Sequence, residues 1–259
     1  MTNKRESRIG EERLNNQGCL MKVVQYNANK DIIIEFQDEY KARVHTQYGL
    51  FLRGKVRNPY YPDLFGIGMT GNKNPIKSEV KIIKEYSSWR CMIERCFSNK
   101  FKEKHPTYLN ATCCKEWLLY VIFYVWLHSQ PNFDKWLNGS QWNIDKDILI
   151  KGNKIYSPET CCLVPDNVNK LFTKCDKVRG KYPIGVHRVR DKFAAYCQNP
   201  LINKRVHLGY HATSIKGFQA YKKYKEKLIK QVAQIEYQNG NITKKCYNAM
   251  LKYEVEITD

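Results

Sequence analysis

The chain has 259 residues, of which 42% are hydrophobic and 13% aromatic, so it can bury cores and is not a disordered tail. Lys and Arg total 44 against 25 acids, giving a formal charge of +19, which favours a polyanion such as DNA, RNA or an acidic membrane surface. The polar N-terminus is not a signal peptide, and the longest apolar run, 117–127, is too short for a bilayer of about 30 Å. We therefore expect a cytoplasmic protein without a membrane partner.

The ten cysteines contain no CxxC pair and include the doublets Cys113-Cys114 and Cys161-Cys162. Adjacent cysteines rarely pair with each other, and a cytoplasmic protein keeps its thiols reduced. Most of these cysteines are therefore expected to be reduced core residues, with a structural zinc site as the less favoured alternative.

The N-terminal part is predicted to be a small antiparallel β-sheet or barrel. Three short runs, residues 21–27, 31–38 and 41–48, are rich in Val, Ile, Tyr and Phe and are separated by turn-forming residues. The following stretch, Arg57–Pro75, is rich in Pro, Gly and Asn and is the best candidate for a linker or surface arm.

Two helices are predicted next. In IIKEYSSWRCMIERCF, residues 82–97, apolar or aromatic residues recur at steps of three and four, which indicates a helix in a helical region that starts near Ile76. A second helix is predicted over Lys115–Gln130. It is apolar nearly all round, so we expect it to lie inside its domain.

A strand, a return strand and a helix are predicted after these. Asn143–Leu149 is the strand and Asn153–Tyr156 its return. Ser157-Pro158-Glu159 is typical of a helix start, with Ser as N-cap and Pro at the first helical position. That helix is expected to run through Leu163, Val164, Val168 and Leu171.

The C-terminal part is predicted to contain three short strands and a long amphipathic helix, at 182–190, 192–199, 205–211 and 214–234. Residues 170–230 carry sixteen Lys or Arg against three acids, a net charge of +13. This segment therefore holds most of the positive excess and is expected to bind a polyanion.

The central residues resemble a divergent phage branch of the HNH homing endonucleases over about residues 80–172. The resemblance is carried by a string of motifs whose combination is more specific than any one piece. Its members are Tyr86, Trp89, Met92, Arg95 and Cys96; Cys114, Glu116 and Trp117; Ile144-Asp145-Lys146-Asp147; and Tyr156-Ser157-Pro158-Glu159-Thr160-Cys161.

The resemblance implies a ββα site that holds Mg²⁺ or Mn²⁺ and hydrolyses a DNA phosphodiester bond. Asp145 matches the acidic metal ligand, and Asn169 matches the closing His/Asn position. Lys146 stands where the family has its histidine base, and Thr160 where it has an asparagine; a lysine is a poor base at neutral pH, but threonine can still offer an oxygen. Asp147 is a candidate second carboxylate on the face of Asp145. The alternative is that Asp-x-Asp is a solvated strand face.

The C-terminal part resembles the ethylene-response-factor type of DNA-binding domain over about residues 182–230. The matching strings are Gly185-Val-His-Arg-Val-Arg, Phe193-Ala-Ala-Tyr, His207-Leu-Gly-Tyr, Thr213 and Ala220-Tyr221. A three-stranded sheet can enter a major groove, and arginine pairs with guanine edges and phosphates. Arg188, Arg190 and Lys192 are expected to share one strand face that contacts double-stranded DNA, with Tyr196, Lys204 and Arg205 nearby.

We therefore predict an α+β, multi-module protein. Its parts are a β-module with linker (1–75), an HNH-like domain (76–175), a DNA-binding domain (180–235) and a tail (236–259). One hypothesis is a Mg²⁺-dependent endonuclease, in the bacterial host cell if a phage encodes it. The other is a non-enzymatic protein that regulates nucleic acid or engages a host factor. The sequence leaves the target site and the oligomeric state open.

Overall fold

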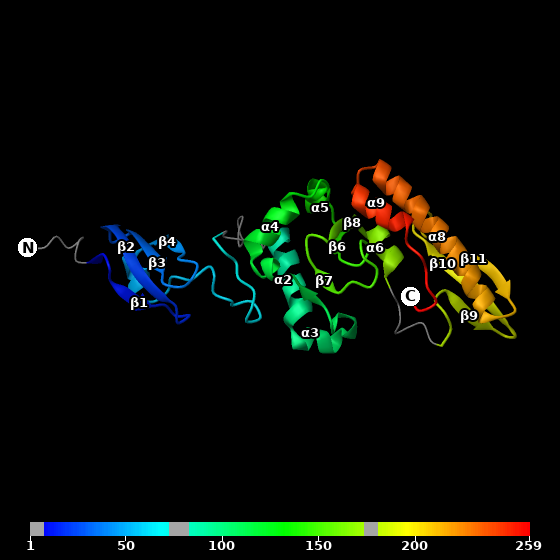
Figure 1. The fold of residues 1–259 in the computed structure, drawn as a ribbon, viewed down its shortest axis with the longest axis horizontal. Helices are drawn as coiled ribbons and strands as arrows, with labels where there is room; N and C mark the ends of the chain where they lie inside the picture. Colours follow the sequence, from blue (N-terminus) through cyan, green and yellow to red (C-terminus); the bar gives the residue numbers. More distant parts are fainter. Residues whose placement is uncertain (1–7, 73–82, 174–180) are drawn as a thin grey trace, which may run out of the picture. The chain divides into compact units, whose positions relative to one another are not determined.

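The computed structural model describes residues 8–72, 83–173 and 181–259. These residues form a mixed α+β protein (Figure 1), and the chain divides into two compact units, Met1–Val125 and Trp126–Asp259. No helix in the described ranges is long and apolar enough to cross a membrane. The finer division into four parts stays a prediction.

The first unit begins with a four-stranded antiparallel sheet in the order β1-β2-β3-β4, so the three predicted runs are confirmed as strands. Alternate residues of β3 point into the core: Ile32, Ile34 and Phe36 are fully buried, together with Met21 and Val23 of β2. The elements are β1 (Glu12–Leu14), β2 (Leu20–Ala28), β3 (Asp31–Phe36), β4 (Arg43–Thr46) and the short helix α1 (Tyr48–Leu52).

The rest of the first unit is mainly helical. The predicted amphipathic helix is confirmed as α2, which buries Trp89, and the indole Nε1 of Trp89 donates to the Trp117 carbonyl oxygen at 2.7 Å. Most of the stretch from Ile76 to the start of α2 lies outside the described residues. The elements are α2 (Lys84–Phe97), α3 (Asn99–Lys104), η2 (Pro106–Tyr108), β5 (Thr112–Cys113), η3 (Lys115–Leu118) and α4 (Tyr120–His128), whose last three residues belong to the second unit.

The predicted helix over Lys115–Gln130 is broken into η3 and α4, and the expectation that it lies inside its domain is wrong in part. Tyr120, Phe123 and Leu127 are fully buried, but Ile122 is 43% and Val125 is 61% exposed. The buried residues follow the three- and four-residue spacing of one helical stripe, so the core covers a single side of this nine-residue helix.

The second unit contains a strand–strand–helix segment followed by a three-stranded sheet and two helices. β6 pairs antiparallel with β8, with Asp145 opposite Cys162, and α6 follows β8 directly. The C-terminal sheet is antiparallel in the order β11-β10-β9, and α8 packs on it, as predicted. The elements are α5 (Phe133–Asn138), β6 (Trp142–Asp145), β7 (Ile155–Tyr156), β8 (Cys162–Pro165), α6 (Asp166–Phe172), β9 (Val186–Val189), β10 (Lys192–Asn199), β11 (Lys204–His211), α8 (Ser214–Gln238) and α9 (Lys244–Leu251).

Two predictions for this segment are wrong. The strand that pairs with β6 is β8, not the stretch 153–156, and no helix starts at Ser157. The backbone N–H of Cys161 donates to the Ser157 carbonyl oxygen at 2.9 Å, which closes a single turn before β8. The run Cys162–Pro165 is continuously apolar and almost fully buried, as in a buried strand, so the helix begins only at Asp166 with Pro165 at its N-cap.

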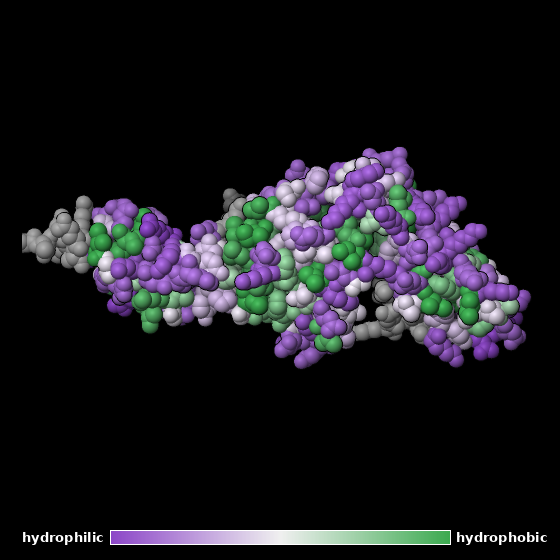
Figure 2. Space-filling model, in the orientation of Figure 1, coloured by the Kyte–Doolittle hydropathy of each residue, from purple (hydrophilic) through white to green (hydrophobic). Residues whose placement is uncertain are grey.

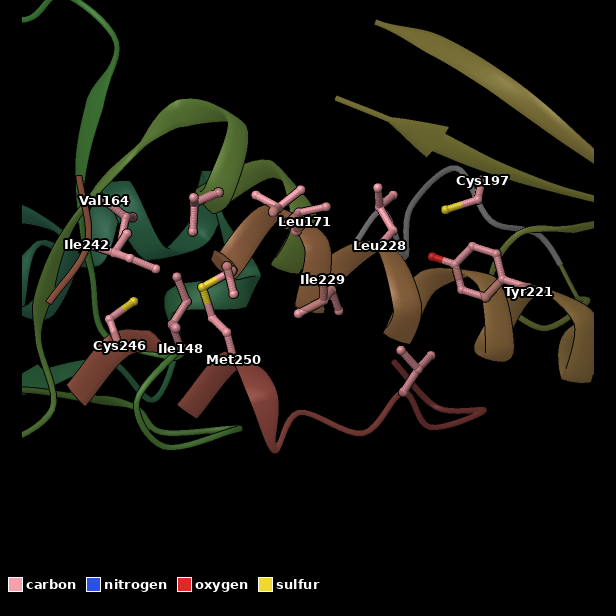
Figure 3. Close-up of a cluster of buried hydrophobic side chains, with 14 of the residues drawn as sticks. Ile148, Val164, Leu171, Cys197, Tyr221, Leu228, Ile229, Ile242, Cys246 and Met250 are labelled. Carbon is pink, nitrogen blue, oxygen red and sulfur yellow. The ribbon is translucent and has the colours of Figure 1, made fainter. Parts of the chain in front are cut away.

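One hydrophobic core joins the strand–strand–helix segment to the C-terminal sheet (Figure 3). Val164 of β8 and Leu171 of α6 belong to the same cluster as Cys197 of β10 and Leu228 of α8. Residues 236–259, predicted as a tail, also contribute, because they complete α8 and form α9, which buries Cys246 within this cluster. Its Sγ lies 4.0 Å from Sγ of Cys162, and both are free thiols, as expected for reduced core cysteines.

Candidate metal site and nucleic-acid interface

The β6–β8–α6 segment carries two of the predicted site residues, Asp145 at the end of β6 and Asn169 within α6. Asn143 and Asp145 share a face of β6, since alternate strand residues point the same way. Asp166 and Asn169 share a face of α6, because they are three residues apart. The Asn143 amide Nδ2 donates to Oδ1 of Asp166 at 3.4 Å, which joins β6 to the first residue of α6.

Asp145 ends β6 and organises the turn that follows. Its Oδ1 accepts the backbone N–H groups of Asp147 at 2.7 Å and Ile148 at 2.8 Å. Burial raises the pKa of the Asp145 carboxyl, and these two hydrogen bonds oppose the rise. Asp145 therefore has a structural role, and its second oxygen makes no hydrogen bond within the described ranges.

Lys146 stands at the predicted base position, and its side chain is only 10% exposed. Its Nζ donates to Oδ1 of Asp147 at 2.5 Å and to the Asn153 carbonyl oxygen at 3.2 Å. The Asn153 amide returns to the Lys146 carbonyl oxygen at 2.8 Å. An ammonium held in this way is a hydrogen-bond donor and offers no lone pair to a proton. The two hydrogen bonds between Lys146 and Asn153 close the loop, and the Lys146 ammonium neutralises the charge of Asp147.

Thr160 and Asn169 differ in what they can offer a cation. The Thr160 hydroxyl is buried, accepts the Ser157 N–H at 3.1 Å and donates to the Ile155 carbonyl oxygen at 2.7 Å. Asn169 is half-buried, and its amide makes no hydrogen bond to any described residue.

The donor set therefore fits Mg²⁺ only in part. Asp145 and Asn169 each keep an oxygen, which suits an ion that retains several water ligands, but Thr160 does not fit. Within 8–72, 83–173 and 181–259, no group of three His, Cys, Asp or Glu side chains could hold a metal ion by itself.

The C-terminal sheet has one face against α8 and one face open. Val186 pairs with Ala195 and both are buried, so their side is the helix-covered face. His187, one residue on from Val186, lies on the open face, and so does Tyr196, one residue on from Ala195. Tyr196 pairs with His207, which extends the open face to β11.

The expectation that Arg188, Arg190 and Lys192 share a face is wrong. Arg188 pairs with Phe193, which packs against the core, whereas Lys192 pairs with Val189 on the open face. Arg190 lies in the turn between β9 and β10 with φ of 53°, a left-handed conformation, so it belongs to neither strand. The Arg188 Nε donates to the Arg190 carbonyl oxygen at 3.1 Å.

Lys204 and Arg205 also point to opposite sides of the sheet. Lys204 pairs with Asn199, which is buried on the helix-covered side, and Arg205 pairs with Gln198. Of the six predicted DNA-contacting residues, three therefore lie on the open face: Lys192, Tyr196 and Arg205.

A row of aromatic rings with one arginine crosses this open face. The rings of Tyr196 and His207 are 4.9 Å apart, and those of His207 and Tyr210 are 4.8 Å apart. The guanidinium of Arg205 lies 4.4 Å from the Tyr196 ring centroid and donates to Nε2 of His187 at 2.5 Å. We call His187, Tyr196, Arg205, His207 and Tyr210 the open-face row.

The sequence reasoning missed the two histidines and Tyr210 of this row. Pairing the buried Val186 with Ala195 would have assigned the faces correctly. The two-residue turn Arg190-Asp191 holds no Gly or Asn, the residues that usually mark such a turn, so the sequence carried no signal for it. Burial and the neighbouring Arg205 charge both lower the pKa of His187, which fits its role as acceptor from Arg205.

The chain as a whole is a mixed α+β protein with a basic, aromatic sheet face. No protein-family model, curated protein or solved structure matches it in comparison.

Proposed function

We propose that the protein binds double-stranded DNA through the open face of its C-terminal sheet. The observation that carries the proposal is the open-face row: five polar or aromatic side chains that lie on three strands, four of them exposed and Tyr196 half-buried. The net charge of +13 over residues 170–230 supplies the attraction to a polyanion.

The chemistry of this face suits base edges and phosphates. A two- or three-stranded sheet can lie in a major groove, where arginine donates two parallel hydrogen bonds to guanine. Arg205 is oriented for such a contact because the Tyr196 ring supports its guanidinium from one side. The aromatic rings of Tyr196 and Tyr210 offer apolar contacts to thymine methyl groups and sugars.

Fluorescence anisotropy with a labelled duplex tests this proposal at low salt. We expect binding by the wild type and weaker binding when Arg205 and His207 are replaced. Absence of binding to any duplex, at a protein concentration far above that needed for non-specific association, would exclude DNA as the partner.

A second candidate function, cleavage of the bound DNA, is favoured by the order β6, β8, α6, with Asp145 at the end of β6, Asn169 in α6 and the Asn143–Asp166 hydrogen bond between these two elements. In it, Asp145 and Asn169 hold Mg²⁺ or Mn²⁺. A bound metal ion would stabilise charge on the phosphate. Lys146 stands near the phosphate as a cation, since its ammonium carries no lone pair for a base.

Nicking of supercoiled plasmid separates the two candidates. The wild type is incubated with Mg²⁺, Mn²⁺ or EDTA, beside Asp145→Asn and the double variant Lys146→His with Thr160→Asn. Metal-dependent nicking that Asp145→Asn abolishes supports the endonuclease. If neither wild type nor double variant cuts, the protein binds without cleaving and serves as a regulator of nucleic acid or a ligand of a host factor.

A further inference from the structure

The outer side of α8 carries a straight row of lysines. Nine α8 residues, among them Phe218, Leu228 and Ile229, face the core. With 3.6 residues per turn, positions separated by three, four or seven lie on one stripe. Lys216, Lys223, Lys227 and Lys230 have these spacings, are exposed, and project opposite the buried side of the helix. We call these four the α8 lysine stripe.

The stripe lysines have no acidic partners among the described residues, whose only ion pair on α8 joins Lys222 to Glu226 at 3.4 Å. Three of them, with Gln234, line a groove of about 940 Å³ beside Leu201 of the β10–β11 turn. Glu226 also lines this groove, but it is engaged by Lys222 and by the Val255 N–H at 2.9 Å. Hydrophilic side chains predominate on the visible surface over α8 (Figure 2).

The α8 lysine stripe and the open-face row lie on opposite sides of the sheet–helix layer. The row lies on the side of the sheet that α8 does not cover, and the stripe lies on the side of α8 turned away from the sheet. A sheet and a packed helix are together about 20 Å thick, since layers pack at about 10 Å and a helix is about 10 Å wide. One straight duplex in contact with the row therefore cannot reach the stripe.

We infer that the α8 lysine stripe binds the sugar–phosphate backbone of a second DNA duplex segment, so that one protein bridges two segments. The inference rests on the proposed function in that the first segment is held by the open-face row. From Lys216 to Lys230 the stripe extends about 21 Å at 1.5 Å per residue. One DNA strand offers a charge every 3.4 Å of axis, so a segment along the stripe presents about six phosphates.

Lysine suits this task because its ammonium is a point charge on a flexible stem that needs no fixed geometry. The stripe holds no arginine or aromatic ring, the residues that read base edges or stack on bases. The second segment is therefore bound without regard to its sequence.

A bridging assay tests the inference. One duplex is fixed to beads, the full-length protein is added, and capture of a second, labelled duplex is measured. The stripe variant is Lys223→Gln, Lys227→Gln and Lys230→Gln. The matched control removes three exposed lysines of the first unit, Lys100→Gln, Lys104→Gln and Lys115→Gln. We expect the stripe variant to capture about tenfold less labelled duplex than the control, since three phosphate contacts are lost.

Further measurements make each outcome decisive. Replacing the same three stripe lysines by arginine should restore capture, and circular dichroism should show unchanged melting, because the positions are exposed. Anisotropy with a single duplex should show that the stripe variant still binds the first segment. Capture by the stripe variant equal to that of the control overturns the inference and leaves DNA binding intact. If the wild-type protein binds no duplex at all, the proposed function itself is contradicted.

Discussion

The loop between β6 and β8 and the open face of the C-terminal sheet use their polar side chains in opposite ways. In the loop, Asp145, Lys146 and Thr160 hydrogen-bond to nearby backbone or side-chain groups. On the open face, Arg205 contacts other members of the row, and the side chains of Arg205, His207 and Tyr210 are exposed. A polar residue that satisfies its own backbone supports structure, whereas one left on an uncovered face is available to a ligand.

The same contrast explains why the motifs of residues 80–172 do not by themselves decide whether the protein cleaves DNA. Asp145 occupies the expected metal-ligand position and also caps the turn that the loop needs. The side chains of the open-face row, by comparison, mainly contact one another and do not hold a backbone turn in place. Changes in the loop should therefore act mainly on stability, and changes in the row mainly on binding.

The largest expected effect is that of salt on DNA binding. Each phosphate contact releases counterions, so six to ten contacts reduce affinity by about 10³ to 10⁵ between 50 and 200 mM salt. The +13 charge over residues 170–230 supplies enough cations for that number. Anisotropy titrations over this range measure the slope. A flat response would mean that the positive charge serves solubility and not DNA binding.

Substitutions in the row should weaken binding more than substitutions on the other side of the sheet. Arg205→Ala should lower duplex affinity by about 1–3 kcal/mol, or roughly five- to 150-fold. Lys204→Ala, next in the chain but on the helix-covered side, should change it less. Both variants lose one charge, so a general electrostatic effect would reduce affinity equally and would contradict the assignment of faces.

Two substitutions of Asp145 should separate the contribution of its oxygen acceptor to stability from that of its negative charge. Asp145→Ala leaves the N–H groups of Asp147 and Ile148 without their acceptor and should lower the free energy of unfolding by about 1–3 kcal/mol. Asp145→Asn keeps an oxygen acceptor and should lose less. Urea denaturation compares the two variants, and DNA affinity should stay unchanged in both. Equal destabilisation would show that the charge, and not the acceptor, supports the turn.

The same carboxyl gives a pH dependence of stability. Because its pKa is raised in the folded protein, the folded state binds more protons than the unfolded state just above the ordinary value of 3.8. Stability contributed by Asp145 therefore falls as pH rises through this window. Asp145→Asn should remove that contribution, so the stability advantage of the wild type over the variant should grow as the pH falls toward 3.8. A constant difference across the acidic range would contradict the raised pKa.

Much of the fold follows from the sequence because local signals agree with the tertiary structure. Alternation in Ile32, Ile34 and Phe36 predicts β3, and the spacing of Trp89, Met92 and Ile93 predicts α2. The Ser157-Pro158 signal failed because the next residues, Cys162–Pro165, are buried as a strand against the core. A local helix-start signal holds no information about such long-range burial.

The candidate site was less predictable because it depends on register. Arg188 and Arg190 look equivalent in the sequence, but the turn takes up Arg190 and pairing with Phe193 turns Arg188 to the helix side. A shift of one residue moves a side chain to the other face of a sheet. The loop hydrogen bonds of Lys146 likewise join residues seven apart, Lys146 and Asn153, which no periodic pattern predicts.

The smallest expected effect concerns His187 and pH. Burial and the neighbouring Arg205 charge lower the pKa of His187, so its ring is neutral in the free folded protein at pH 7. As the pH falls through 6.5, the unfolded state therefore takes up a proton before the folded state does. The stability that His187 contributes should therefore decrease at acidic pH. A bound phosphate favours the protonated ring, so DNA affinity should instead rise modestly as pH falls below this value. His187→Gln should flatten both trends while leaving Arg205 and Tyr196 in place. Melting curves and anisotropy between pH 5.5 and pH 7.5 measure them. Affinity that rises equally in the variant would assign the pH effect to other groups and remove His187 from the DNA-contacting row.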